Sequence, residues 1–186
     1  LVDQVGFSSH GSNELILEAI RSGRFSFASL HLHLFDPARL PLAEEALAKG
    51  LGVMAISPAD KGGRLFDPPE LLRQACAPLE PLQLAYRFLL ARGISTLTLG
   101  AAEPADLHWA GLDGSALSAE EQAALDRLSE QRQKRLGAEA CGQCRACLPC
   151  PQQLPIPELL RLRNLAVGHG MAVSYTHLTL PTTAYV

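Results

Sequence analysis

The chain has 186 residues, of which 47 % are hydrophobic and 19 % are charged, and its net charge is −3. This balance lacks the basic patch of a nucleic-acid-binding protein, and no apolar run reaches the ~18 residues that a membrane helix needs. The first residues lack the charged and apolar regions of a signal peptide. We therefore expect a cytoplasmic protein with neither nucleic acid nor membrane among its partners.

Apolar segments of strand length alternate with segments of helical periodicity along the first part of the chain. The predicted strands are Val2–Ser8, Phe25–His33, Leu51–Ser57 and Ile94–Gly100. The predicted helices between and after them are Asn13–Ser22, Pro41–Lys49, Pro81–Gly93 and the short Pro104–Trp109, and the loop is Pro58–Pro69. The third strand is almost continuously apolar, as in a parallel strand buried on both faces. Consecutive strand–helix units favour a parallel α/β architecture.

The pattern becomes helical in the later part of the chain. Ser118 and Glu121 have the spacing of a capping box, which predicts the start of a polar helix that reaches about Leu136. A further helix is predicted over Glu158–Leu165, with leucines on one side that would pack it against the main unit. We expect a helical extension appended to the α/β unit.

Four cysteines follow one another with two residues between each pair: Cys141, Cys144, Cys147 and Cys150. This spacing is similar to the bacterial ferredoxin run, whose last gap has three residues instead of two, and it favours a [4Fe–4S] cluster. Two alternatives stay open. A zinc site normally takes its pairs from two separated knuckles, and disulfides need an oxidising compartment. Cys76 lies far from the others and is expected to be a small buried apolar residue.

Two histidines, His31 and His33, alternate on one predicted strand. A His-x-His pair on a strand can bind a metal ion, but the sequence offers no evident third ligand. Histidines that face the interior or a loop are therefore the favoured interpretation.

The end of the chain differs from the rest. Residues 173–183 resemble one reading frame of the transposase adaptor used in sequencing libraries, and Leu1 is not preceded by Met. We expect a gene fragment with an artefactual tail; a natural Thr-rich tail is the alternative. The expected division is 1–115 for the α/β unit, 116–172 for the extension and 173–186 for the tail.

Several of these segments are similar to a known family. The segments Gly6–Gly11, Ala55–Pro58 and Leu99–Ala101 resemble strands five, seven and eight of the aldo/keto reductases. The cysteine segment, with Leu154–Pro157 after it, resembles the C-terminal extension of their iron–sulfur branch. The resemblance reaches from Leu1 to about Ala172. It implies the C-terminal half of a (β/α)₈ TIM barrel with an α-helical, ferredoxin-like [4Fe–4S] extension; whole barrels of this type have about 250 residues.

The resemblance also implies a function. The parent protein would be an NADP- or NAD-dependent oxidoreductase acting on a small-molecule carbonyl or alcohol, and its cluster would serve an electron-transfer partner or stabilise the extension. The family's catalytic Tyr, Asp, Lys and His lie on the first four strands, so no catalytic residue is expected here and the fragment would be inactive. Tyr86 is expected in the core. The alternative is an iron–sulfur electron-transfer or scaffold module without reductase chemistry.

By the same resemblance, the nicotinamide dinucleotide would contact residues at the ends of the strands. These are Ser8, Ser9, Ser29, Ser57, Lys61, Gly62, Gly63, Gly100, Ala101 and Ala102, with His10 as a further candidate. The serines at 8, 9 and 29 would hold the carboxamide. The segment from Ser57 to Gly63 would offer donors to the pyrophosphate, and the last three residues lead into a helix whose N-terminus favours phosphate. Ordinary turn chemistry is the alternative for each of them.

Overall fold

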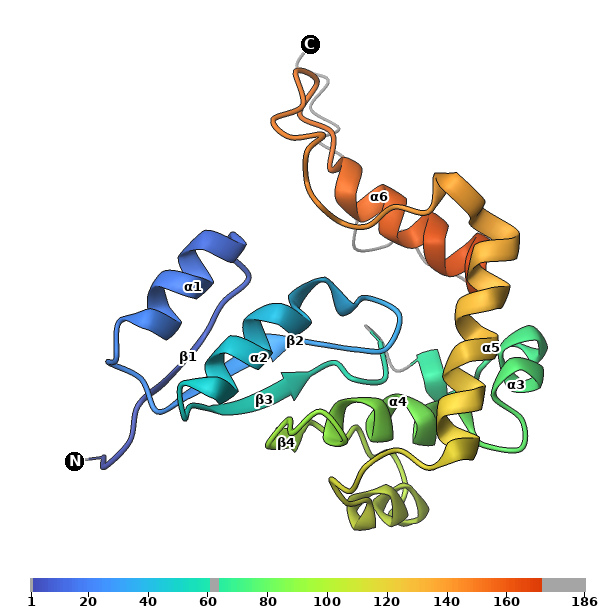
Figure 1. Cartoon of the computed structure of the whole chain (residues 1–186), viewed down its shortest axis with the longest axis horizontal. Helices are drawn as coiled ribbons and strands as arrows, with labels where there is room; N and C mark the ends of the chain where they lie inside the picture. Colours follow the sequence, from blue (N-terminus) through green and yellow to red (C-terminus); the bar gives the residue numbers. More distant parts are fainter. Residues whose placement is uncertain (1, 61–63, 172–186) are drawn as a thin grey trace.

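The computed structural model describes residues 2–60 and 64–171, and within them the fold is mixed α/β around a four-stranded parallel sheet (Figure 1). The strands are β1 (Gly6–Ser8), β2 (Phe27–His31), β3 (Gly52–Ile56) and β4 (Thr96–Leu97). Their order in the sheet is β1-β2-β3-β4, so each strand pairs with its neighbour in sequence. The expected parallel α/β fold is therefore confirmed.

The predicted helices are present close to their predicted ranges, and the structure contains one further helix. The helices are α1 (Asn13–Arg21), α2 (Leu40–Ala48), α3 (Glu70–Cys76), α4 (Pro81–Leu90), α5 (Ala119–Leu136) and α6 (Ile156–Arg163). The sequence analysis did not predict α3. The predicted helix after β4 is a 3₁₀ helix, Pro104–Gly111, and α6 continues as a π-helix, Asn164–Gly168. The predicted capping box of α5 is present, because the Ser118 hydroxyl accepts from the Glu121 N–H and the Glu121 carboxylate accepts from the Ser118 N–H.

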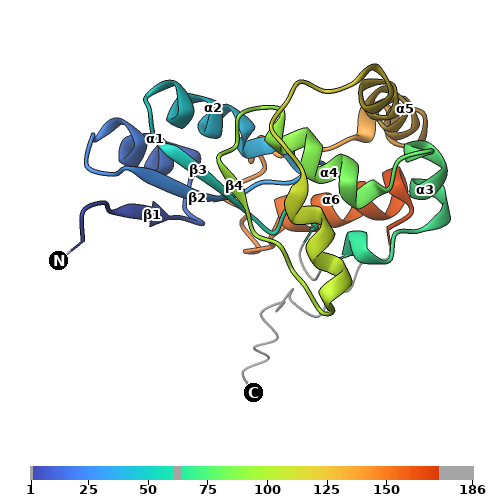
Figure 2. The same cartoon turned by 90° about the horizontal axis from the view of Figure 1, so that it is seen from below.

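One face of the sheet is covered by helices. The register places Phe7, Ala28 and Val53 side by side across three strands, and these residues join one apolar cluster with side chains from α1, α2 and α4. The buried helix residues of this cluster are Ile16, Ile20, Leu42, Ala43, Ala46, Phe88 and Leu89. Figure 2 shows α1 and α2 on the same side of the sheet.

The opposite face of the sheet has smaller and more polar side chains. Because side chains alternate along a strand, this face carries the row Gly6, Phe27, Gly52 and the row Ser8, Ser29, Met54, Thr96. The Phe27 side chain is 37 % exposed. All-parallel sheets are normally covered on both faces, so this is the face that a further layer of structure would cover.

A second apolar cluster joins α3, α4, α5 and the π-helix, and it includes Leu72, Leu84, Leu128 and Leu165. Cys76 is fully buried in this cluster, and burial raises the pKa of its thiol to about 12, as suits an inert apolar residue. Tyr86 is also buried, as expected for a core residue. Among the described residues, no helix is both long and apolar enough to cross a membrane.

Arg87 of α4 connects the sheet-covering helices to the start of α5. The residue is 6 % exposed, and Nε and a terminal nitrogen donate to the two oxygens of Glu121 at 2.6 and 3.2 Å. The remaining donors reach Asp113 Oδ1 at 3.0 Å and the carbonyls of Ser115 and Ala116. This ion pair with Arg87 holds the pKa of the Glu121 carboxyl below its usual range. The pair fixes the first turn of α5 against the α/β unit.

Candidate functional site

The cysteine loop lies between α5 and α6, and all four of its cysteines are free thiols. Cys144 and Cys147 are exposed, whereas Cys141 and Cys150 are half-buried. The Gln143 backbone N–H donates to Cys141 Sγ at 3.4 Å, as expected of a loop whose amides face thiolates. Gln143 and Arg145 both have left-handed backbone conformations, with φ of 57° and 60°. Such sparsely populated conformations gather at ligand sites.

The first cysteine of the loop is held by the π-helix. Asn164 Oδ1 accepts from the Cys141 N–H at 3.2 Å, and Asn164 Nδ2 donates to the Cys141 carbonyl at 2.8 Å. Asn164 is 8 % exposed and opens the π-helix. π-Helical turns occur frequently at functional sites. The pair of bonds fixes the backbone of Cys141 relative to α6.

The extension is also tied to the sheet through buried charges. Arg161 of α6 lies 3.4 Å from Asp60 Oδ1, and the same oxygen lies 3.4 Å from His33 Nε2. All three side chains are at least nine-tenths buried. The contact places α6 beside the carboxyl ends of β2 and β3.

A cavity of about 260 Å³ lies between the strand ends and the cysteine loop. It is lined mainly by polar side chains, namely His10, Asn13, His31, Asp36, Arg39, Gln143, Arg145 and Glu158. Arg39 donates to the carbonyls of Ser9 and Gly11, which joins the loop after β1 to this site. Burial lowers the pKa of Arg39, and repulsion from Arg145 adds to that effect. Of the described cofactor candidates, His10 lines this cavity and the predicted serines, glycine and alanines do not, while Gln143 and Arg145 bring the cysteine loop to it.

The predicted cofactor residues of β1 to β3 lie at the same end of the sheet. Ser8 and Ser29 are register partners, and the Ser29 hydroxyl lies 3.8 Å from Met54 Sδ. The Ser9 hydroxyl accepts from the Gly11 N–H at 3.0 Å. Ser57 has a left-handed conformation, φ 56°, at the end of β3. The Ser8 and Ser29 hydroxyls therefore lie on neighbouring strands, with Met54 as the next residue of this row on β3.

The predicted phosphate residues are less well gathered. Lys61, Gly62 and Gly63 lie outside the described residues. Gly100 and Ala101 are exposed after β4, and the Ala102 N–H donates to the Asp106 carboxylate at 2.8 Å. A phosphate at Ala102 would have to displace that carboxylate.

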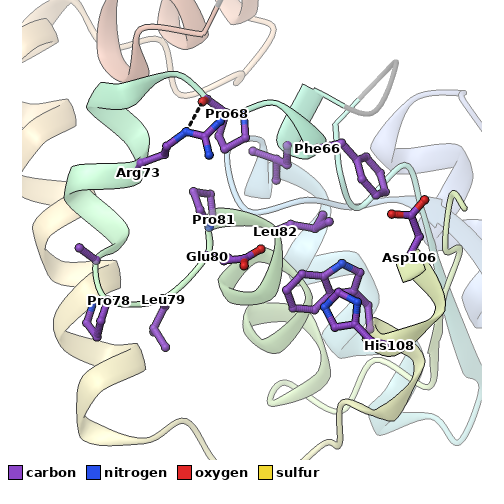
Figure 3. A pocket seen from close by; sticks show the side chains of 13 residues that line it. Phe66, Pro68, Arg73, Pro78, Leu79, Glu80, Pro81, Leu82, Asp106 and His108 are labelled. Carbon is purple, nitrogen blue, oxygen red and sulfur yellow. Dashed lines mark hydrogen bonds between the residues drawn. The ribbon is translucent and has the colours of Figure 1, made fainter. Parts of the chain in front are cut away.

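A larger cavity of about 460 Å³ lies beyond the ends of β3 and β4 (Figure 3). Phe66, Arg73, Asp106 and His108 surround it, and Arg73 donates to the Pro68 carbonyl at 2.9 Å. The described cofactor candidates of the sequence analysis do not line it. No sequence motif marks its walls, which come from α3, the α3–α4 connection, the start of α4 and the 3₁₀ helices Arg64–Phe66 and Pro104–Gly111.

The histidine pair has a third neighbour that the sequence did not reveal. One nitrogen each of His31 and His33 and one carboxylate oxygen of Asp36 lie within 4.8 Å of one another. Among the described residues, no other three His, Cys, Asp or Glu side chains have ligand atoms that all lie within 4.8 Å of one another, and this includes the four cysteines of the loop. The cysteine sulfurs are therefore less closely gathered than this triad.

No family model, no curated protein and no solved structure matches this chain.

Proposed function

We propose that the chain binds one [4Fe–4S] cluster through Cys141, Cys144, Cys147 and Cys150 and forms part of an NADP- or NAD-dependent aldo/keto reductase. The cysteine loop is the observation that carries the proposal, because it offers four free thiols on one short segment. Iron–sulfur clusters are held by sets of four Cys thiolates. The N–H bond to Cys141 Sγ suits a charged sulfur, because hydrogen bonds to the sulfurs stabilise and tune such clusters.

The architecture supports the barrel part of the proposal. In a (β/α)₈ barrel each parallel strand pairs with its neighbours in sequence, and helices cover only the outer face. The order β1-β2-β3-β4 and the packing of α1, α2 and α4 on one face of the sheet agree with half of such a barrel. A doubly wound sheet would instead carry helices on both faces. On this proposal, the uncovered face with Ser29 and Met54 belongs to the barrel interior.

The dinucleotide would lie at the carboxyl ends of the strands, where barrel enzymes bind their ligands. Ser8 and Ser29 are register partners on β1 and β2, and Ser57 directly follows the end of β3. The catalytic Tyr and its partners would belong to the other four strand–helix units of the parent protein, so the chain itself would bind and orient the cofactor.

Anaerobic reconstitution of the full chain with iron and sulfide tests the cluster. We expect about four iron and four sulfide per chain, as the [4Fe–4S] stoichiometry requires, and a brown protein with broad visible absorption. Cys144→Ser should abolish or convert the cluster. Cys76→Ser is the matched control and should leave it intact, because Cys76 is fully buried in the second apolar cluster. Stoichiometric zinc without sulfide in the purified chain would refute the cluster.

A second candidate is an electron-transfer module without reductase chemistry. The exposure of Cys144 and Cys147 favours it, because an exposed cluster edge permits electron exchange with a partner. The discriminating observation is any gene sequence found upstream of the segment that encodes this chain. An Asp, Tyr, Lys and His set there supports the reductase, whereas a missing Tyr supports the electron-transfer module.

A further inference from the structure

Two histidines and one aspartate gather at the carboxyl end of β2. His31 ends the strand, and His33 follows on the same side because side chains alternate along extended backbone. The chain then turns back, and the Asp36 N–H donates to the His33 carbonyl at 3.2 Å. This turn brings the Asp36 carboxylate within 4.8 Å of one nitrogen from each histidine.

We propose that His31, His33 and Asp36 bind a divalent first-row transition metal, Fe²⁺ or Zn²⁺, at a site separate from the cysteine loop. Two imidazoles and one carboxylate form the ligand set of mononuclear iron(II) sites and of catalytic zinc sites. Both kinds of site keep at least one coordination position for water or substrate. His31 and Asp36 also line the 260 Å³ cavity, which provides the space for such a position.

The surroundings of His33 support its role as a ligand. The Phe35 N–H donates to His33 Nδ1 at 3.2 Å, so the lone pair is on Nδ1 and the neutral ring carries its proton on Nε2. Nε2 lies 3.4 Å from the buried Asp60 carboxylate. Histidine ligands of metals commonly donate their second N–H to a carboxylate, which fixes the tautomer and orients the ring. A metal at Nδ1 replaces one neutral hydrogen bond from Phe35.

The charges around the site leave the Asp36 carboxylate available. Arg39 lines the same cavity, but its terminal nitrogens donate to the Ser9 and Gly11 carbonyls. Within residues 2–60 and 64–171, Asp36 forms no ion pair shorter than 4.0 Å. Arg161 is paired with Asp60 and Glu158. Arg39 and Arg161 are thus bonded to other groups, and Arg145 also lines the cavity.

Cobalt(II) binding tests the proposal with a probe that reports its ligands. The probe is added to a full-length Ser variant with Cys141→Ser, Cys144→Ser, Cys147→Ser and Cys150→Ser, so that no loop thiolate binds the cobalt. Circular dichroism compares the fold of this variant with that of the native chain. We expect one Co²⁺ per chain, displaced by Zn²⁺ and competed by Fe²⁺. His33→Gln and Asp36→Asn should each weaken binding by at least ~10-fold, and Asp60→Asn by ~10- to 100-fold, the range for partners that orient a ligand.

His10→Gln is the matched control, because His10 lines the same cavity but is not one of the three proposed ligands. The affinity of this variant for Co²⁺ should stay within about twofold of that of the Ser variant alone. The proposal is overturned by binding below one equivalent, by unchanged affinity in His33→Gln and Asp36→Asn, or by an equal loss in His10→Gln. If the Ser variant is unfolded, the native chain serves instead. It should then bind one equivalent of Co²⁺ that produces no sulfur-to-cobalt charge-transfer absorption and that His33→Gln removes; failure to find this equivalent also refutes the site.

Discussion

Replacing Arg87 by Met should destabilise the chain more than any change of an exposed ion pair. Arg87 is 6 % exposed and Glu121 is 7 % exposed, and Nε lies 2.6 Å from Oε1. Met fills much of the same volume but leaves the Glu121 carboxylate buried without its cation. Removing one partner of a buried pair costs about 3–5 kcal/mol. In a domain of this size 1 kcal/mol corresponds to about 2–4 °C, so even the lower bound lowers the melting temperature by about 6–12 °C.

The exposed pair Arg21–Glu45 provides the matched control. It has the same two-pronged geometry, with distances of 2.6 and 2.9 Å, but the Arg21 side chain is 58 % exposed. Exposed pairs contribute about 0–1 kcal/mol, so Arg21→Met should change the urea midpoint little. Unfolding of both variants is followed by circular dichroism in urea. Equal losses of stability in Arg87→Met and Arg21→Met would refute the assignment of Arg87 as the connection between α4 and α5.

Three further changes test other parts of the molecule. Burial, with Arg132 and Arg135 nearby, lowers the pKa of His169 from 6.5 to about 4. The unfolded chain therefore binds a proton that the folded chain does not, so the free energy of unfolding should fall as the pH drops from about 6.5 to about 4. His169→Phe should make the urea midpoint less dependent on pH in this range. Asn164→Ala removes two hydrogen bonds to the Cys141 backbone, worth about 0.5–1.5 kcal/mol each, so the reconstituted cluster should lose its colour faster when a chelator is added. An unchanged rate of bleaching would show that these two bonds do not stabilise the cysteine loop. Ser118→Ala removes the N-cap of α5 and should lower the free energy of unfolding by ~1 kcal/mol, whereas a loss below ~0.3 kcal/mol would mean that α5 does not depend on its cap.

The sequence predicted the elements whose signals are local. The apolar run Leu51–Ser57 predicted β3, and the Ser118–Glu121 spacing predicted the start of α5. The predicted strands are longer than the observed ones, because hydrogen-bond pairing ends where the neighbouring strand ends. Helix α3 was missed because seven residues complete only two turns, too few for an apolar period to emerge.

The candidate site was predictable only where its residues form a local pattern. The spacing of the cysteines indicated one group of ligands, and the alternation of His31 and His33 indicated another. The third residue of the histidine group, Asp36, comes close to His31 and His33 through a turn that no sequence pattern predicted. The bond between Asn164 and Cys141 spans 23 residues, and a single sequence carries no signal for such a pairing.

The sequential order of the strands affects how the chain folds. The contact from Ser29 to Met54 spans 25 residues and that from Val53 to Ser95 spans 42, whereas Arg161 reaches Asp60 across 101. Closing a longer loop costs more conformational entropy and slows folding. The sheet can therefore grow by one strand–helix unit at a time, and we expect α6 to dock after it. If the cysteine loop binds the proposed cluster, its insertion would follow on a scaffold that is already formed.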